Sequence, residues 1–379
     1  SIPVEPTLPA PLDRVGVLDI PYRGRSLGAF RERGAKKLTA VLACEVSSFQ
    51  LLDPPSQERR LAQWGTVLSG CADTPVRRLQ WLERTAPAQG DALAGWVHSA
   101  ADPELARRGE PLLESYLELI DSSAPVIHEH EILLAIQIDT GRLHGDPQQT
   151  LLEQTERIAR GLEAADVRVL GALSGAQLAG VLRTGFDPFA HAQLAARRAA
   201  GDAAAADVTT AGPLAATEQW DSYRTDGALH ATFWINGWPR VDVPPSFMGA
   251  LLAPSGTVRT VAICFEPIPA ARSTREVEAA ITRDRADREL RHRFGQSETA
   301  RQRQAQESAL RRESELAAGH GEVRFSGYVT VSARDEDELR RACQEIHQHA
   351  ALARIELRRL YGRQAEAHSF TLPLARGLT

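Results

Sequence analysis

The chain has 379 residues, which corresponds to roughly two or three domains of ordinary size. Hydrophobic residues make up 43% and charged residues 25%, a composition typical of soluble globular proteins that excludes collagen-like, mucin-like and wholly disordered classes. The formal net charge is −5, so binding to nucleic acid or to an anionic membrane surface would require a local basic patch.

The chain begins with an irregular stretch and continues into a β-α-β unit. Residues 1–35 contain several prolines and glycines with little hydrophobic periodicity, which predicts an N-terminal arm. The apolar, β-branched run at 38–46 predicts a strand, and 49–52 a second short strand after a turn. A helix is expected from an N-cap at Ser56, and a strand at 76–83 completes the unit.

The rest of the first half continues to alternate helices and strands. Apolar residues at helical spacing mark the helices, and nearly continuous apolar runs mark the strands. Ser174 is expected to be the N-cap of the last helix. The helices are predicted at 91–98, 111–121, 150–165 and 174–184, and the strands at 131–139 and 167–173.

An alanine-rich stretch at 191–216 predicts a linker to the second half. The second half contains a long polar stretch of helix formers at 273–318, which predicts a helical hairpin because its apolar positions are sparse. The other elements of this half are strands at 230–234, 258–266, 323–332 and 355–360 and an amphipathic helix at 335–351.

These elements predict an α+β protein of two related halves, each a ferredoxin-like arrangement of split β-α-β units. The first domain is expected at 36–190 and the second at 217–379, with the helical insertion at about 273–318. The cysteines, Cys44, Cys71, Cys264 and Cys343, lie far apart in the sequence and predict buried, reduced thiols. No apolar run approaches the ~20 residues needed to span a bilayer.

The sequence lacks the common motifs of nucleotide-binding and hydrolytic enzymes. Lysine occurs only at Lys36 and Lys37, which excludes a Walker lysine elsewhere. No Gly-x-Gly-x-x-Gly follows a predicted strand, and no Gly-x-Ser-x-Gly supplies a nucleophile. These observations favour a protein that is not an enzyme and that needs no cofactor.

Two pairs of residues have spacings compatible with metal ligands. His128 and His130 alternate with glutamates, so both lie on one face of a predicted strand. Cys343 and His347 lie four positions apart on a predicted helix. Most catalytic zinc sites need three protein ligands, and neither pair has an identified third. A solvated strand entrance and an ordinary helix explain both pairs, and a metal-dependent enzyme is the alternative.

Basic and aromatic residues are interleaved at two predicted strands. A nucleic-acid surface has this pattern, but so does a sheet with one solvated face, which the acidic net charge favours. The first group is Arg77, Arg78 and Arg84 around Trp81, and the second is Arg354, Arg358 and Arg359 before Tyr361.

Three tryptophans of the second half, Trp220, Trp234 and Trp238, form a cluster in the sequence. They could provide a binding platform. Filling of the core or of an interface is the favoured interpretation, because aromatic side chains dominate both.

Short sequence motifs spread over nearly the whole chain resemble those of a known family. They are LLD at 51–53, ERRL at 58–61, RLQWLERT at 78–85, FDPF at 186–189, WDSYRTDG at 220–227, WPRV at 238–241, LRRLYGRQ at 357–364 and TLPL at 371–374. In this order they resemble a family of actinobacterial proteins encoded with conjugation-like, type IV secretion modules. The second half, with its acidic helix start DEDEL at 335–339, is also similar to the non-catalytic N-terminal domain of conjugative secretion ATPases.

The resemblance implies a non-catalytic scaffold at the cytoplasmic face of the cell membrane, in a secretion complex whose ATPase is a separate polypeptide. It implies membrane helices before Ser1, transfers no catalytic residue, and is compatible with a homo-oligomer that does not bind nucleic acid directly. The 273–318 insertion is expected to be the docking surface, because its balanced charges and sparse apolar stripe suit helix-on-helix contact. A structural membrane component of a type VII-like secretion system is the alternative.

Overall fold

The computed structural model describes residues 8–46, 49–87, 128–190, 211–252, 256–269, 272 and 321–378. In the first half, the strands are β1 (Val15–Tyr22), β2 (Arg25–Glu32), β3 (Lys37–Val46), β4 (Val76–Pro87), β5 (His128–Asp139) and β6 (Val167–Ala172). The helices of this half are α1 (Pro54–Ser69), α5 (Pro147–Ala164) and α6 (Gly175–Phe186), with short 3-10 helices η1 (Phe49–Leu51), η3 (Thr140–Arg142) and η4 (Pro188–Ala190).

The second half has a similar set of elements. Its strands are β7 (Ala216–Glu218), β8 (Tyr223–Thr225), β9 (Leu229–Gly237), β10 (Val258–Ile268), β11 (Glu322–Ala333) and β12 (Glu356–Arg359). Its helices are α8 (Gly249–Leu252), α11 (Glu336–Leu352) and α12 (Gln364–Ser369). Within the described residues, no helix has the length and apolar character needed to cross a membrane.

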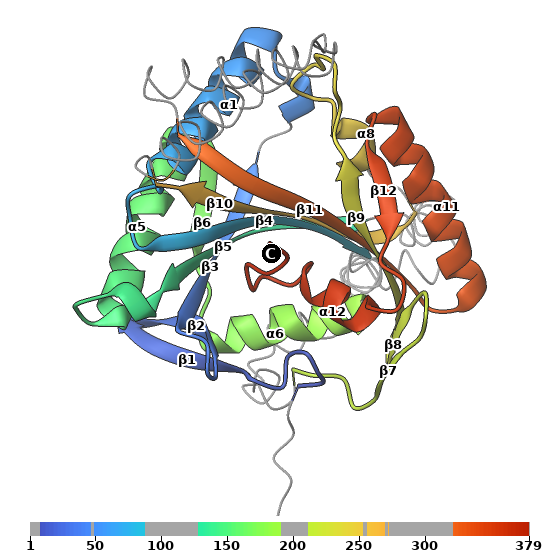
Figure 1. Ribbon diagram of the computed structural model, residues 1–379, viewed down its shortest axis with the longest axis horizontal. Helices are drawn as coiled ribbons and strands as arrows, with labels where there is room; N and C mark the ends of the chain where they lie inside the picture. The colour runs from blue at the N-terminus through green and yellow to red at the C-terminus, as the bar shows by residue number, and fades with distance from the viewer. Residues whose placement is uncertain are drawn as a thin grey trace, which may run out of the picture.

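All these strands join one antiparallel sheet, which Figure 1 shows running through both halves. The strand order is β1-β2-β3-β5-β4-β10-β11-β9-β8-β7, with β6 also paired to β3 and β12 to β9. The α+β class predicted from the sequence is therefore confirmed. The halves meet where β4 pairs with β10, and the middle pair of that ladder is Leu82 and Ala262.

The two halves repeat the same order of elements. The first runs β3-α1-β4-β5-α5-β6 and the second β9-α8-β10-β11-α11-β12. In space these strands follow the orders β6-β3-β5-β4 and β12-β9-β11-β10, with all neighbours antiparallel. Because the equivalent strands β4 and β10 pair antiparallel, an approximate two-fold axis passes close to the Leu82–Ala262 pair.

Details of the backbone repeat between the halves as well. A residue with positive φ follows the end of α5 and the end of α11, namely Asp166 at 58° and Arg354 at 56°. A carboxylate from the outermost strand accepts a hydrogen bond at the start of the helix that follows each half. Asp19 of β1 accepts from the N–H of Gly175, and Glu218 of β7 accepts from that of Ala365.

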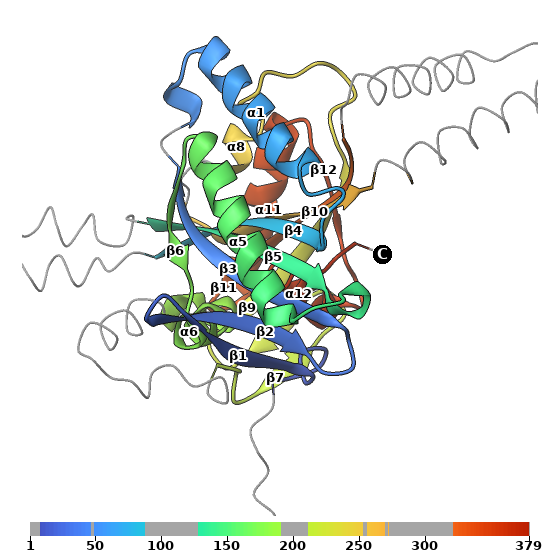
Figure 2. The ribbon, with the colours of Figure 1, turned by 90° about the vertical axis from the view of Figure 1, so that its left-hand side faces the viewer.

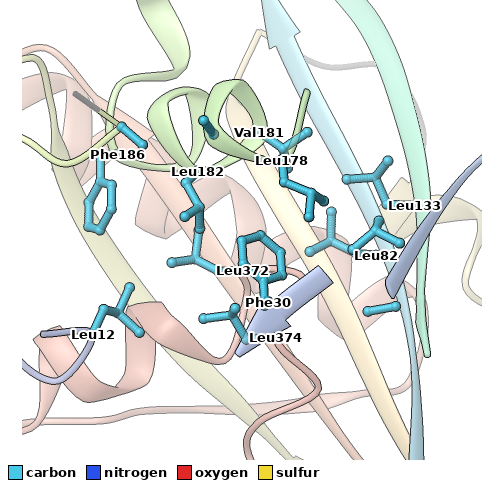
Figure 3. Close-up of a cluster of buried hydrophobic side chains, with 14 of the residues drawn as sticks. Leu12, Phe30, Leu82, Leu133, Leu178, Val181, Leu182, Phe186, Leu372 and Leu374 are labelled. Atoms are coloured by element: carbon cyan, nitrogen blue, oxygen red, sulfur yellow. The ribbon is translucent and has the colours of Figure 1, made fainter. Parts of the chain in front are cut away.

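Helices cover both faces of the sheet. On one face, α1 and α5 pack against the first half and α8 and α11 against the second. Figure 2 shows α1 and α5 side by side. On the opposite face, α6 packs with the C-terminal tail around Leu82 and Leu133, and Figure 3 shows Leu372 and Leu374 of that tail among the α6 leucines.

The prediction of an irregular N-terminal arm at residues 1–35 is wrong for residues 15–22 and 25–32, because these form the strands β1 and β2. The glycines that suggested an irregular stretch have structural roles. Gly24 lies in the β1–β2 turn with φ of 74°. Gly28 lies where α6 begins, and a Cβ on it would be 2.5 Å from the backbone nitrogen of Gly175. Leu27 and Phe30 of β2 are buried.

Two smaller predictions near α1 are also wrong. Residues 49–52 form the 3-10 helix η1 and a turn instead of a strand, and the Gln57 amide donates to the carbonyls of Phe49 and Leu52. The N-cap of α1 is Asp53 and not Ser56. The short helix α12 was not predicted. By contrast, Ser174 caps α6 in a full capping box, as expected.

Several predicted segments lie outside the described residues. These are the helices at 91–98 and 111–121, the linker up to residue 210, and the helical insertion at 273–318. The other predicted strands and helices are confirmed within a few residues of their expected ends.

Candidate docking groove

The described residues hold no group of three or more histidine, cysteine or acidic side chains that could bind a metal. Of the first candidate pair, His130 lies beside Thr85 and Glu83, and the side chain of His128 lies outside the described part. Of the second pair, Cys343 is a buried residue of α11 and faces the core. His347 packs edge-to-face on Phe233 with ring centroids 5.1 Å apart, and burial lowers its pKa.

The cysteines are buried, as the sequence predicts, and none forms a disulfide in the described part of the chain. Burial raises the pKa of Cys44 and of Cys264 to about 12. A thiol reacts as its thiolate, so these groups should be inert in the native protein. We expect almost no reaction with a thiol reagent at pH 8 before unfolding and four reacting thiols in denaturant. Rapid native labelling of two or more thiols would contradict this burial.

The first arginine group does not form a basic surface. Arg77 and Arg78 both pair with Glu266, at 3.0 and 3.1 Å. Arg84 is fully buried and pairs with Glu131 at 3.2 Å. These charges are used inside the fold, so they are not available to a phosphate backbone.

The second arginine group lies beside an exposed aromatic pair. Arg359 pairs with Asp221 at 3.6 Å and lies over the ring of Tyr361. Trp220 is 71% exposed and stacks on Tyr361, so of the two expected roles, core filling and interface filling, it does not fill the core.

The other two tryptophans are separate from Trp220. The indole of Trp234 donates to the hydroxyl of Ser326, and Trp238 packs against Phe325. The three tryptophans therefore form no common platform.

An apolar groove of about 360 Å³ lies between α1 and α8, over the strands where the two halves meet. Its floor includes Trp81 of β4 and both Val261 and Ile263 of β10. These residues flank the Leu82–Ala262 pair in the β4–β10 ladder, so the floor straddles the approximate two-fold axis. The groove therefore depends on both halves of the chain.

Helix α1 forms one wall of the groove. Two prolines follow the N-cap Asp53 in the first turn of α1. Proline is tolerated there because the backbone N–H groups of the first turn have no partner within the helix. Its residues Leu61 and Trp64 line the groove, and Trp64 lies edge-to-face against Trp81 with ring centroids 5.7 Å apart. Leu61 is 45% exposed, an unusual position for a large apolar side chain beside an apolar floor.

The opposite wall comes from α8 and the loop before it. Phe247, Met248 and Leu252 line the groove here, while Leu251 of the same helix is buried against α11. The end of the groove is closed by Val46 at the end of β3 and by residues at the start of β6. Side chains from both sequence halves therefore surround one apolar space.

The charged groups of the groove are paired. Arg60 of α1 contacts Asp166 at 3.3 Å at the rim, and Glu83 lies 3.4 Å from His130. Glu83 also lies near Arg259, which does not line the groove: burial lowers the pKa of Arg259, and the carboxylate of Glu83 opposes that shift. Among the described lining residues there is no histidine, cysteine or lysine. The lining is mainly apolar, which suits contact with apolar groups.

A buried polar layer lies on the opposite face of the sheet, between α6 and α12. Arg84 donates to the Val181 carbonyl of α6, and His230 of β9 lies 3.0 Å from the Phe186 carbonyl. The ring of His368 lies 4.4 Å from that of His230. Burial lowers the pKa of His230 to about 4. Burial, followed by the charges of His230 and Arg84, lowers the pKa of His368 well below its usual range.

Sequence reasoning identified Leu61 and Trp64 only as apolar positions of a helix. Their role at the groove depends on the β4–β10 pairing, which joins strands about 180 residues apart and leaves no local pattern. The only local signal is the apolar stripe of α1, which is as expected for any core helix.

Comparison with known proteins identifies no family for this chain. No family model matches the sequence, and no curated protein matches it. Its function is therefore proposed below from the geometry of the groove and from the expectations of the sequence analysis.

Proposed function

We propose that this chain is a non-catalytic docking subunit of a conjugation-type secretion complex and binds an ATPase supplied in trans. The observation that carries the proposal is the apolar groove on the two-fold axis, with exposed Leu61 on its wall. Contiguous apolar surfaces on soluble proteins commonly mark protein interfaces.

We also propose that each half is a ferredoxin-like unit. The repeated order strand-helix-strand-strand-helix-strand supports this, as do the antiparallel spatial orders β6-β3-β5-β4 and β12-β9-β11-β10. Placement at the cytoplasmic face of the membrane, a homo-oligomeric state and docking through the 273–318 insertion belong to the same proposal. The insertion lies outside the described residues, so the groove is the surface on which the test is designed.

The test is size-exclusion chromatography with light scattering, on the full chain alone and mixed with the secretion ATPase encoded nearest to its gene. We expect a stoichiometric complex whose affinity falls at least tenfold with Leu61→Asp, because a carboxylate in an apolar interface is desolvated without a partner. Leu170→Asp is the matched control, since Leu170 is 59% exposed and lies on β6 away from the groove lining. Absence of a complex, or equal weakening by both variants, would reject the proposal.

A further inference from the structure

The approximate two-fold axis makes α1 and α8 equivalent helices. Each connects the first and second strands of its half, β3 to β4 and β9 to β10. Each also packs against the second helix of its half, α1 on α5 and α8 on α11. Their lengths differ greatly, because α1 has 16 residues and α8 has 4. The helical layer is therefore complete on one side of the axis and reduced to about one turn on the other.

The groove lies where this layer is incomplete. Leu61 and Trp64 on α1 face it from one side, and Met248 and Leu252 face it from the other. Leu61 on the longer helix is 45% exposed. Packed helices lie roughly 8–10 Å apart with side chains of one helix filling the grooves of the other. An element with the shape of a helix would complete this layer.

From this asymmetry we propose that the groove takes an amphipathic α-helix of a partner protein, a conclusion that rests on the proposed docking function. The helix presents large apolar residues at i, i+3, i+4 and i+7 to the floor formed by Trp81 and Ile263. Its polar flank lies toward the Arg60–Asp166 pair, which marks the polar rim of the groove. The charged groups that line the groove already have partners, so a charged ligand would gain little electrostatic energy by binding there.

Synthetic helices test this proposal without the ATPase. The probe is a fluorescein-labelled peptide of 16 residues, the length of α1, with leucine at i, i+3, i+4 and i+7 positions and glutamate–lysine pairs elsewhere. A scrambled peptide of the same composition lacks the stripe, and dodecanoate serves as an acyl-chain competitor. Fluorescence anisotropy on the full chain should give saturable binding that is at least tenfold weaker for the scrambled peptide. Leu61→Asp should remove this binding, and Leu170→Asp should leave it unchanged.

Equal binding of the two peptides would overturn the proposal, and so would binding that Leu61→Asp does not change. Displacement of the striped peptide by micromolar dodecanoate would assign the groove to an acyl chain instead. Light scattering on the same samples reveals self-association, and a dimer lost with Leu61→Asp would make a second copy the occupant. If the striped peptide does not bind but the ATPase complex forms and depends on Leu61, the proposed docking function is retained and the proposal of a helical partner is rejected. If neither the striped peptide nor the ATPase binds, the proposed docking function is rejected.

Discussion

Replacing Gln80 with leucine is expected to lower the free energy of unfolding by about 2–6 kcal/mol. Gln80 lies fully buried in β4. Its amide donates to the Phe370 carbonyl at 2.7 Å and accepts from the Ala375 N–H at 2.8 Å. A leucine fills a similar volume but leaves both backbone groups buried without a partner, and each such group costs about 1–3 kcal/mol.

Urea unfolding followed by circular dichroism measures this effect. Gln149→Leu is the control, because Gln149 is exposed on α5 and pairs only with a neighbouring glutamate, so its change should stay within about 0.5 kcal/mol. A loss below 1 kcal/mol in the Gln80 variant would mean that the tail is not fixed by this amide.

The C-terminal tail matters because side chains from both halves hold it. Gln137 of β5 donates to the Leu374 carbonyl, and Tyr328 of β11 donates to the Gly377 carbonyl. The tail lies on the face of the sheet opposite the groove, where Leu372 and Leu374 fill the core around α6 (Figure 3). The TLPL phrase at 371–374 is therefore a structural feature that ties the halves together.

The sequence predicted the elements whose signals are local. Apolar periodicity marked α5 and α11, and Ser174 as an expected N-cap marked the start of α6. The hairpin β1–β2 was missed because its glycines serve a turn and a close approach to α6, and both uses resemble an irregular segment in sequence. Helix α12 has 6 residues, too short for any periodic pattern.

The candidate groove could not be predicted, because it arises from long-range pairing. Trp81 and Val261 share a floor because β4 lies beside β10, and their positions in the sequence give no sign of this pairing. Arg84 illustrates the same limit. Its place with Arg77 and Arg78 around Trp81 in the sequence was compatible with a basic surface, but in β4 its side chain contacts α6 and is buried.

Acidification from pH 7 to pH 4 is expected to remove roughly 3 kcal/mol of stability through His230 alone, at about 1.4 kcal/mol per unit of pKa shift. The pKa of this buried ring falls from 6.5 to about 4 in the folded protein. Its Nε2–H donates to the Phe186 carbonyl, and its Nδ1 accepts from the Ser332 hydroxyl, so the neutral ring already satisfies both nitrogens. Below pH 6.5 the unfolded chain binds a proton that the folded chain excludes.

Stability is therefore lost as the pH falls through the window from 6.5 to about 4, and His368 acts in the same direction. Urea midpoints at half-unit steps of pH measure the slope. The variant His230→Gln should be less stable at pH 7 because it disturbs the Ser332 and Phe186 contacts, but its stability should depend less steeply on pH. His144→Gln, at an exposed position, should keep the full slope. An unchanged slope in the His230 variant would show that other groups control acid unfolding.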